Sequence, residues 1–186
     1  MINLIDTIKV PMNAEQLKRV QRIDAEDFFL VKIKAKKQLI LEGKPSDEHT
    51  LEEGILALKQ YYAVAVFDPK NPHAISDFVD PFWHAHILDT KRYKRFCLEA
   101  IGYFMDHQPN NPEDQEEMDY LQRAYCYTSD IYAQLYSYIN YELTPAKPCS
   151  DNLICFHFGN SEPSKTAMFD FNPAMEPIVE HLAATC

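Results

Sequence analysis

Proline outnumbers glycine threefold in this chain, which has 12 prolines and only 4 glycines. Loops that cradle phosphates or dinucleotides need several closely spaced glycines, and neither a GxGxxG nor a Walker sequence occurs. The sequence therefore predicts no nucleotide cofactor. The prolines instead divide the chain into long stretches in which apolar residues recur at helical spacing. These stretches predict a mainly α-helical fold, compact and bundle-like.

Length and composition favour a single domain. The 186 residues are 46% hydrophobic and 12% aromatic, which is enough to close one core. We therefore expect one helical domain over residues 1–186. No apolar run approaches the ~18 residues of a membrane span, so no membrane partner is expected. The amino-terminal residues lack the pattern of a secretory signal, and the predicted location is the cytoplasm.

Charge and cysteine usage narrow the class of partner. The protein is acidic, because 18 basic against 28 acidic side chains give a net charge of -10, and this charge disfavours nucleic acid as a partner. Five cysteines at irregular spacing fit reduced thiols in the cytoplasm better than a disulfide framework. The partner classes that remain are a small molecule and a protein.

The positions of capping residues set the expected elements. Asn13 and Thr90 are expected N-caps, and Gly43 and Gly102 are expected to end helices. Residues 143–186 form a C-terminal extension, where strand-forming residues appear. The sequence predicts helices over 14–23, 25–42, 51–67, 75–88, 91–102, 114–142 and 173–184, and a short extended or β element over 153–158.

Histidines gather around the only tryptophan. Trp83, His84 and His86 follow Asp80 closely, and His107 comes five residues after the expected helix end at 102. On an α-helix His84 and His86 point about 200° apart, whereas Asp80 and His84 share a face. This clustering makes the segment the main candidate for a functional site.

Three arrangements of the segment follow from helical geometry. One site would use Asp80 with His84, another would use His86 with Asp89 beside Thr90, and a third would need the helix to end near His84 so that both imidazoles converge. A fold that returns antiparallel on this helix would add His107 to any of them.

Imidazole and carboxylate ligands together suit zinc, iron or manganese. Two histidines and a carboxylate leave coordination positions open for water or substrate, so hydrolysis and oxidation are both open to such a site. Trp83 would pack beneath the ligands, and Tyr93 would supply a supporting hydrogen bond. A structural alternative is equally specific: the same histidines could hydrogen-bond carbonyl or carboxylate groups inside a buried helix pair.

The segment also resembles a known family through an aspartate, a Trp-His-x-His sequence, a following leucine and aromatic residue, and a later glycine and histidine. The residues that carry this pattern are Asp80, Trp83, His84, His86, Leu88, Tyr93, Gly102 and His107. The pattern is similar to that of the glycine-rich domain-containing protein-like family, and the resemblance covers about residues 50–142. It implies that these residues form one local unit. With 4 glycines the chain has no glycine-rich tail, so functions of such a tail are not carried over.

Cysteines offer weaker candidates. Cys155 and His157 alternate on the expected strand near Cys149, but the paired cysteines of a structural zinc site are absent. Cys97 is expected to be a core residue. An alternative is that Cys97 is a nucleophile activated by His84 or His107.

Tyrosines and lysines offer surface candidates. On the helix expected over 114–142, Tyr127, Tyr138 and Tyr141 lie outside the main apolar stripe and are open to a partner. The lysines of 32–37 predict a solvated helix face, and the basic run of 91–95 could attract an anionic ligand.

Two functional hypotheses result. The first is a metal-dependent hydrolase or oxidoreductase built on Asp80, His84, His86 and His107. The second is a non-catalytic helical interaction module, in which the Trp-His-x-His segment is a structural polar network and the tyrosine-rich surface binds a partner.

Overall fold

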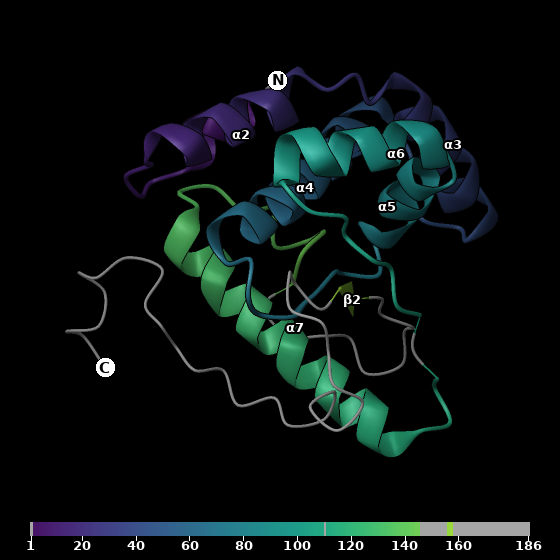
Figure 1. The fold of residues 1–186 in the computed structure, drawn as a ribbon. Coiled ribbons are helices and arrows are strands. Elements are labelled where there is room, and N and C mark those ends of the chain that lie inside the picture. Colours follow the sequence, from purple (N-terminus) through teal and green to yellow (C-terminus); the bar gives the residue numbers. More distant parts are fainter. Residues whose placement is uncertain (1, 110, 146–155, 158–186) are drawn as a thin grey trace.

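A computed structural model describes residues 2–109, 111–145 and 156–157. The fold is mainly α-helical, which confirms the predicted class (Figure 1). In chain order the elements are α1 (Leu4–Thr7), α2 (Ala14–Ala25), α3 (Phe29–Leu41), α4 (Glu48–Phe67), β1 (His73–Ala74), α5 (Asp80–Ile87), α6 (Thr90–Phe96), the π-helical turn η1 (Cys97–Ile101), α7 (Gln115–Leu135) and β2 (Phe156–His157).

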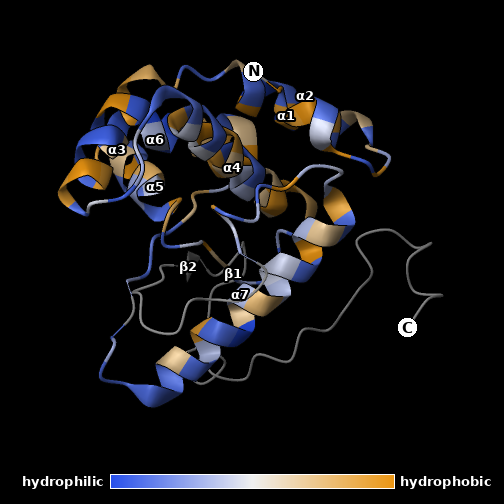
Figure 2. Cartoon of the chain, turned by 180° about the vertical axis from the view of Figure 1, so that it is seen from behind, coloured by the Kyte–Doolittle hydropathy of each residue, from blue (hydrophilic) through white to orange (hydrophobic). Residues whose placement is uncertain are grey.

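Helix α4 is the centre of the molecule. Most of its residues are buried, and α1, α2, α3, α5, η1 and α7 all contact it. Helix α3 and helix α5 form the most extensive helix pair. The helix α7 runs below this group, and β1 lies against it (Figures 1 and 2). The core is therefore shared by all the long helices, with α4 as its axis.

A glycine lets α5 approach α4 closely. The Phe82 ring is fully buried, and a Cβ atom placed on Gly54 would lie only 2.3 Å from its tip. Since real Cβ contacts are essentially never this short, only glycine fits at this position of α4. The contact fixes how deeply α5, which carries the histidine segment, sits on the central helix.

The amino-terminal segment determines where α7 ends. The N–H of Lys9 donates to the Leu135 carbonyl at 2.9 Å, and the N–H of Ser137 donates to the Thr7 carbonyl at 2.7 Å. A β-bridge between positions 8 and 136 lies between these bonds. The predicted helix end at 142 was therefore wrong, because pairing with the amino-terminal segment turns the chain extended at Tyr136.

The short β element is present, and its partner was not anticipated. Strand β2 pairs antiparallel with β1, with His73 opposite His157 and Ala74 opposite Phe156. β2 falls inside the predicted range 153–158, whereas no strand was predicted at β1. The predicted helix 173–184 lies outside the described residues.

Other boundaries moved for local reasons. Helix α3 begins at Phe29 rather than at 25, because the Asp27 carboxylate accepts a hydrogen bond from the Phe29 N–H. Helix α5 begins at Asp80 rather than 75. The helix end at Gly102 is confirmed, since this residue has a φ of 102° and its N–H closes a π turn on Cys97. In the described part of the chain, no helix is long and apolar enough to cross a membrane.

We expect Gly54→Ala to destabilise the protein by about 1 to 3 kcal/mol, because the added methyl group overlaps the Phe82 ring. In an unconstrained helix the same change would stabilise by about 1 kcal/mol, so the sign of the effect identifies the clash. Chemical denaturation measures the free energy of unfolding. The double variant Gly54→Ala/Phe82→Leu should lose less stability than the two single variants lose together, because the smaller side chain relieves the overlap. Losses of unfolding free energy that add exactly would contradict a direct contact.

Candidate metal centre

Helix α5 separates the histidine segment into an outer and an inner face. The helix has a proline in its first turn, where the missing N–H costs nothing, and it is eight residues long. Asp80 and His84 lie four residues apart on the outer face, and the His84 side chain is 46% exposed. Trp83 and His86 are buried on the inner face. The helical period alone produces this division.

The chain after Gly102 brings His107 back to α5. The backbone turns at Gly102, which has a left-handed φ, and the following segment is fastened at Met105. The Tyr93 hydroxyl donates to the Met105 carbonyl at 2.8 Å and accepts from the Trp83 indole N–H at 3.0 Å. Met105 itself is buried. His107, two residues later, is thereby placed beside the outer face of α5.

Asp80, His84 and His107 converge. The Nε2 atoms of His84 and His107 are 2.6 Å apart, and His84 Nδ1 lies 3.5 Å from Asp80 Oδ2. One ligand atom from each residue lies within 4.8 Å of the other two. This group could hold a metal ion. Of the three arrangements open to the sequence, the structure assembles the first, completed by His107.

The distances suit a transition metal after a small adjustment. Two nitrogens on one tetrahedral zinc ion are about 3.3 Å apart, because each Zn–N bond is about 2.0–2.1 Å. The two imidazoles would need to separate by about 0.7 Å, which the half-exposed His84 side chain can accommodate. Asp80 can act as a ligand itself, or it can accept the Nδ1–H of His84 and leave Nε2 for the ion.

The electrostatics keep His107 in the form that binds metals. Burial, followed by the charge of the neighbouring His84, lowers the pKa of His107 to about 4. The ring is therefore neutral at neutral pH. The Trp83 ring lies against it, with centroids 4.9 Å apart. Trp83 thus covers one side of the group.

The structure places His86 apart from this group. Its Nδ1 is 2.8 Å from the Tyr62 hydroxyl, and the rings of Phe28, Tyr93 and Phe96 lie around it with centroids within 5.3 Å. Its Nε2 has no hydrogen-bond partner among the described residues. The sequence did not identify Tyr62 or Phe28 as neighbours of His86, since both lie in segments distant from α5 in the chain.

The remaining predicted residues lie at the junction of α5 and α6. Asp89 occupies the N-cap position of α6, in place of the predicted Thr90, and makes no capping side-chain bond there. Thr90 is exposed and begins the helix. Cys97 is buried, and burial raises the pKa of its thiol to about 11, so the thiolate needed of a nucleophile is scarce at neutral pH.

We expect His86 to make the protein less stable in acid. Burial, followed by the nearby Arg92, lowers its pKa from 6.5 to about 3, with Asp89 opposing. The unfolded chain binds a proton below about pH 6.5 and the folded one does not, so stability is full above that pH and falls as pH decreases. The loss through this residue should reach about 2 kcal/mol at pH 5.

Urea unfolding of the wild type and of His86→Gln, repeated between about pH 5 and pH 7.5, measures this contribution. Glutamine keeps a polar side chain but cannot titrate in this range. The difference between the two proteins removes the effects of all other groups. If the unfolding free energies of the two proteins changed with pH in parallel, the pH dependence could not be assigned to His86.

Comparison with known proteins gives one family. No curated protein and no solved structure matches the chain. The family described as UCP032817-like matches residues 18–131, which is more than half of the chain and includes Asp80, His84 and His107. This match does not confirm the naming after the glycine-rich domain. The protein belongs to the UCP032817-like family.

Proposed function

We propose that the protein is a metal-dependent hydrolase whose centre consists of Asp80, His84 and His107. One observation carries this proposal: two imidazole nitrogens and a carboxylate from separate parts of the chain converge at a position open to solvent. The two Nε2 atoms lie at a hydrogen-bonding distance of 2.6 Å, and a cation would replace this hydrogen bond once the rings separate by about 0.7 Å.

The ligand set selects the class of ion. Imidazole with carboxylate favours zinc, iron or manganese over calcium or copper(I). Three protein ligands leave coordination positions free, which is the arrangement of catalytic rather than structural sites. When bound, such an ion lowers the pKa of a coordinated water from 15.7 to about 7 and so supplies a nucleophile at neutral pH.

The exposure of the site favours hydrolysis over oxidation. The His84 side chain is 46% exposed, so water reaches the site freely. Water is the second substrate of a hydrolysis, whereas a site that excludes water protects reactive intermediates from side reactions.

Each residue has a distinct task in this proposal. His84 and His107 would hold the ion, and Asp80 would either bind it or fix the His84 ring through Nδ1. Trp83 orients the His107 ring by contact. Tyr93 positions the segment that carries His107, through its bond to Met105.

The alternative of a tyrosine-rich interaction surface has less support. Tyr127 donates its hydroxyl to Asp68 and Tyr138 donates to Glu53, so both hydroxyls are used within the protein. Of the three tyrosines that the sequence left open, only Tyr141 is mostly exposed, at 54%. The buried network around His86 fits a structural role and coexists with a metal centre on the opposite face of α5.

We expect protein purified without a polyhistidine tag to contain or take up one zinc, iron or manganese ion. His84→Ala and His107→Ala should each lower the affinity for that metal at least about tenfold, because each removes a ligand. Elemental analysis and calorimetric titration measure content and affinity. His49→Ala, which removes an exposed histidine on α4, is the matched control and should bind as the wild type does.

His86→Ala separates this centre from one that includes His86. It should retain the metal and lose about 1 to 3 kcal/mol of stability, since Tyr62 loses a buried partner. A wild-type protein that is folded but fails to bind all three added metals would reject the centre. If His86→Ala kept its fold but lost the metal, the assignment of the metal centre to the outer face of α5 would be rejected.

Hydrolytic activity requires a separate test. The metal-loaded protein should cleave activated esters or phosphate esters, such as p-nitrophenyl acetate or bis(p-nitrophenyl) phosphate, at a rate that rises as the coordinated water deprotonates near pH 7. His107→Ala should lower this rate at least about 100-fold, and His49→Ala should not change it. A loaded protein without activity on either class would leave metal binding in place and reject hydrolysis.

A further inference from the structure

Helix α3 is apolar on two opposite faces. Its inner face carries Val31, Ala35 and Leu39, which are buried. On its other side five large apolar side chains are exposed, by 39% to 81%. These side chains, here called the outer face of α3, belong to Phe29, Leu30, Ile33, Ile40 and Leu41.

The outer face is a continuous arc rather than a scatter. At about 100° per residue its five side chains fall within an arc of roughly 120°, centred opposite the buried stripe. Helix α3 lies at the edge of the molecule, with hydrophobic and hydrophilic residues interleaved along it (Figures 1 and 2). Single exposed apolar residues are ordinary, but a contiguous set indicates a docking surface.

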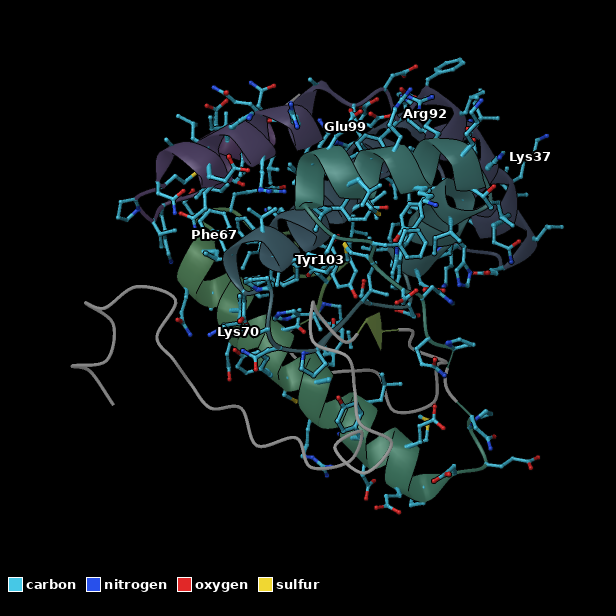
Figure 3. All side chains as sticks on the ribbon, viewed as in Figure 1. Lys37, Phe67, Lys70, Arg92, Glu99 and Tyr103 are labelled. Atoms are coloured by element: carbon cyan, nitrogen blue, oxygen red, sulfur yellow. The ribbon has the colours of Figure 1, made fainter. Side chains whose placement is uncertain are left out.

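Lysines border this arc. Helix α3 contains four lysines and no acidic residue, although the chain as a whole has a net charge of -10. By helical position Lys34 and Lys36 flank the arc on its two sides and Lys37 lies within it. Lys34 and Lys37 form no ion pair with the residues that the structure describes. Lys37 points away from the body of the protein (Figure 3).

A basic pocket lies beside the start of α3. Asp89, Lys91, Arg92 and Arg95 line a pocket of about 350 Å³ on α6. Arg92 connects it to the segment just before α3, because its Nε donates to Glu26 at 2.6 Å. The exposed Leu88, 74% accessible, precedes the pocket. Arg92 is ion-paired with Glu26 and Asp27, so Lys91 and Arg95 are the cations that the pocket adds to those of α3.

We propose that the outer face of α3 docks on the surface of an anionic phospholipid bilayer. The apolar side chains would enter the boundary between headgroups and acyl chains, while the lysine stems extend along this surface and their ammonium groups reach phosphates. The pocket on α6 would receive further headgroup phosphates. This is attachment at the interface, so it needs no spanning helix.

Charge favours lipid over a second copy of the chain. Two copies meeting through this face would bring the same unpaired lysines together, which opposes association. An anionic bilayer instead offers both an apolar layer and negative charge, with roughly 1 kcal/mol gained per lysine or arginine near the surface.

Vesicle sedimentation tests the proposal. The wild-type protein should bind vesicles of phosphatidylcholine with about one-third phosphatidylserine, and it should not bind pure phosphatidylcholine vesicles. Phe29→Gln/Ile40→Gln should weaken binding at least tenfold, because it makes the outer face polar. Leu98→Gln/Tyr141→Gln, which changes residues of similar exposure on other elements, should bind as the wild type does.

A second pair of variants tests the charges. Lys34→Gln/Lys37→Gln should weaken binding to the anionic vesicles and reduce its dependence on salt. Lys18→Gln/Arg123→Gln lowers the net charge equally, by two, but on α2 and α7, and should have little effect. Lys91→Gln/Arg95→Gln tests the pocket and should also weaken binding.

Three results would overturn the proposal. The first is a wild-type protein that does not bind the anionic vesicles. The second is equal binding by the wild type and Phe29→Gln/Ile40→Gln. The third is a dimer, seen by sedimentation equilibrium, that this variant abolishes while vesicles remain unbound, which would assign the face to a second copy of the chain.

Discussion

The hydroxyl group of Tyr93 connects the three segments on which the candidate centre depends. It accepts a hydrogen bond from Trp83 on α5 and donates one to the carbonyl of Met105. Tyr93 itself belongs to α6 and is buried, and burial raises its pKa far above the ordinary value, so the hydroxyl keeps its proton. One neutral group therefore fixes α5, α6 and the returning chain in a single geometry. The bond to Met105 holds the segment in which His107 meets His84.

The period of an α-helix places the polar residues of α5 in two different environments, one exposed and one buried. Asp80 and His84, four residues apart, share the outer side of α5, where they meet His107. His86, two residues after His84 and about 200° around the helix, points inward. Inside, desolvation makes the charged form of His86 costly, whereas outside the accessible His84 can exchange water for a ligand. A short Trp-His-x-His sequence can in this way supply one histidine to the core and another to a candidate metal centre.

The sequence predicted what depends on local periodicity and missed what depends on distant contacts. Asp80 and His84 were recognisable as one face, since four residues make about one helical turn. The end of α7 was not, because it depends on hydrogen bonds such as that between Ser137 and Thr7, which are 130 residues apart. The enclosure of His86 by Tyr62 likewise requires knowing how α4 and α5 cross. The lysines of α3 suggested a solvated face, and only the packing of its inner stripe reveals the apolar arc outside.

The bond between His86 and Tyr62 explains how an exposed centre can be placed accurately. The aromatic rings around His86 pack in many orientations at similar cost, because dispersion is weakly directional. A buried hydrogen bond is directional, and misalignment would leave both groups unsatisfied in a dry environment. It therefore fixes the rotation of α5 against α4, as Gly54 and Phe82 fix its depth. The inner network thus positions α5, and with it Asp80 and His84 on the face that could hold a metal.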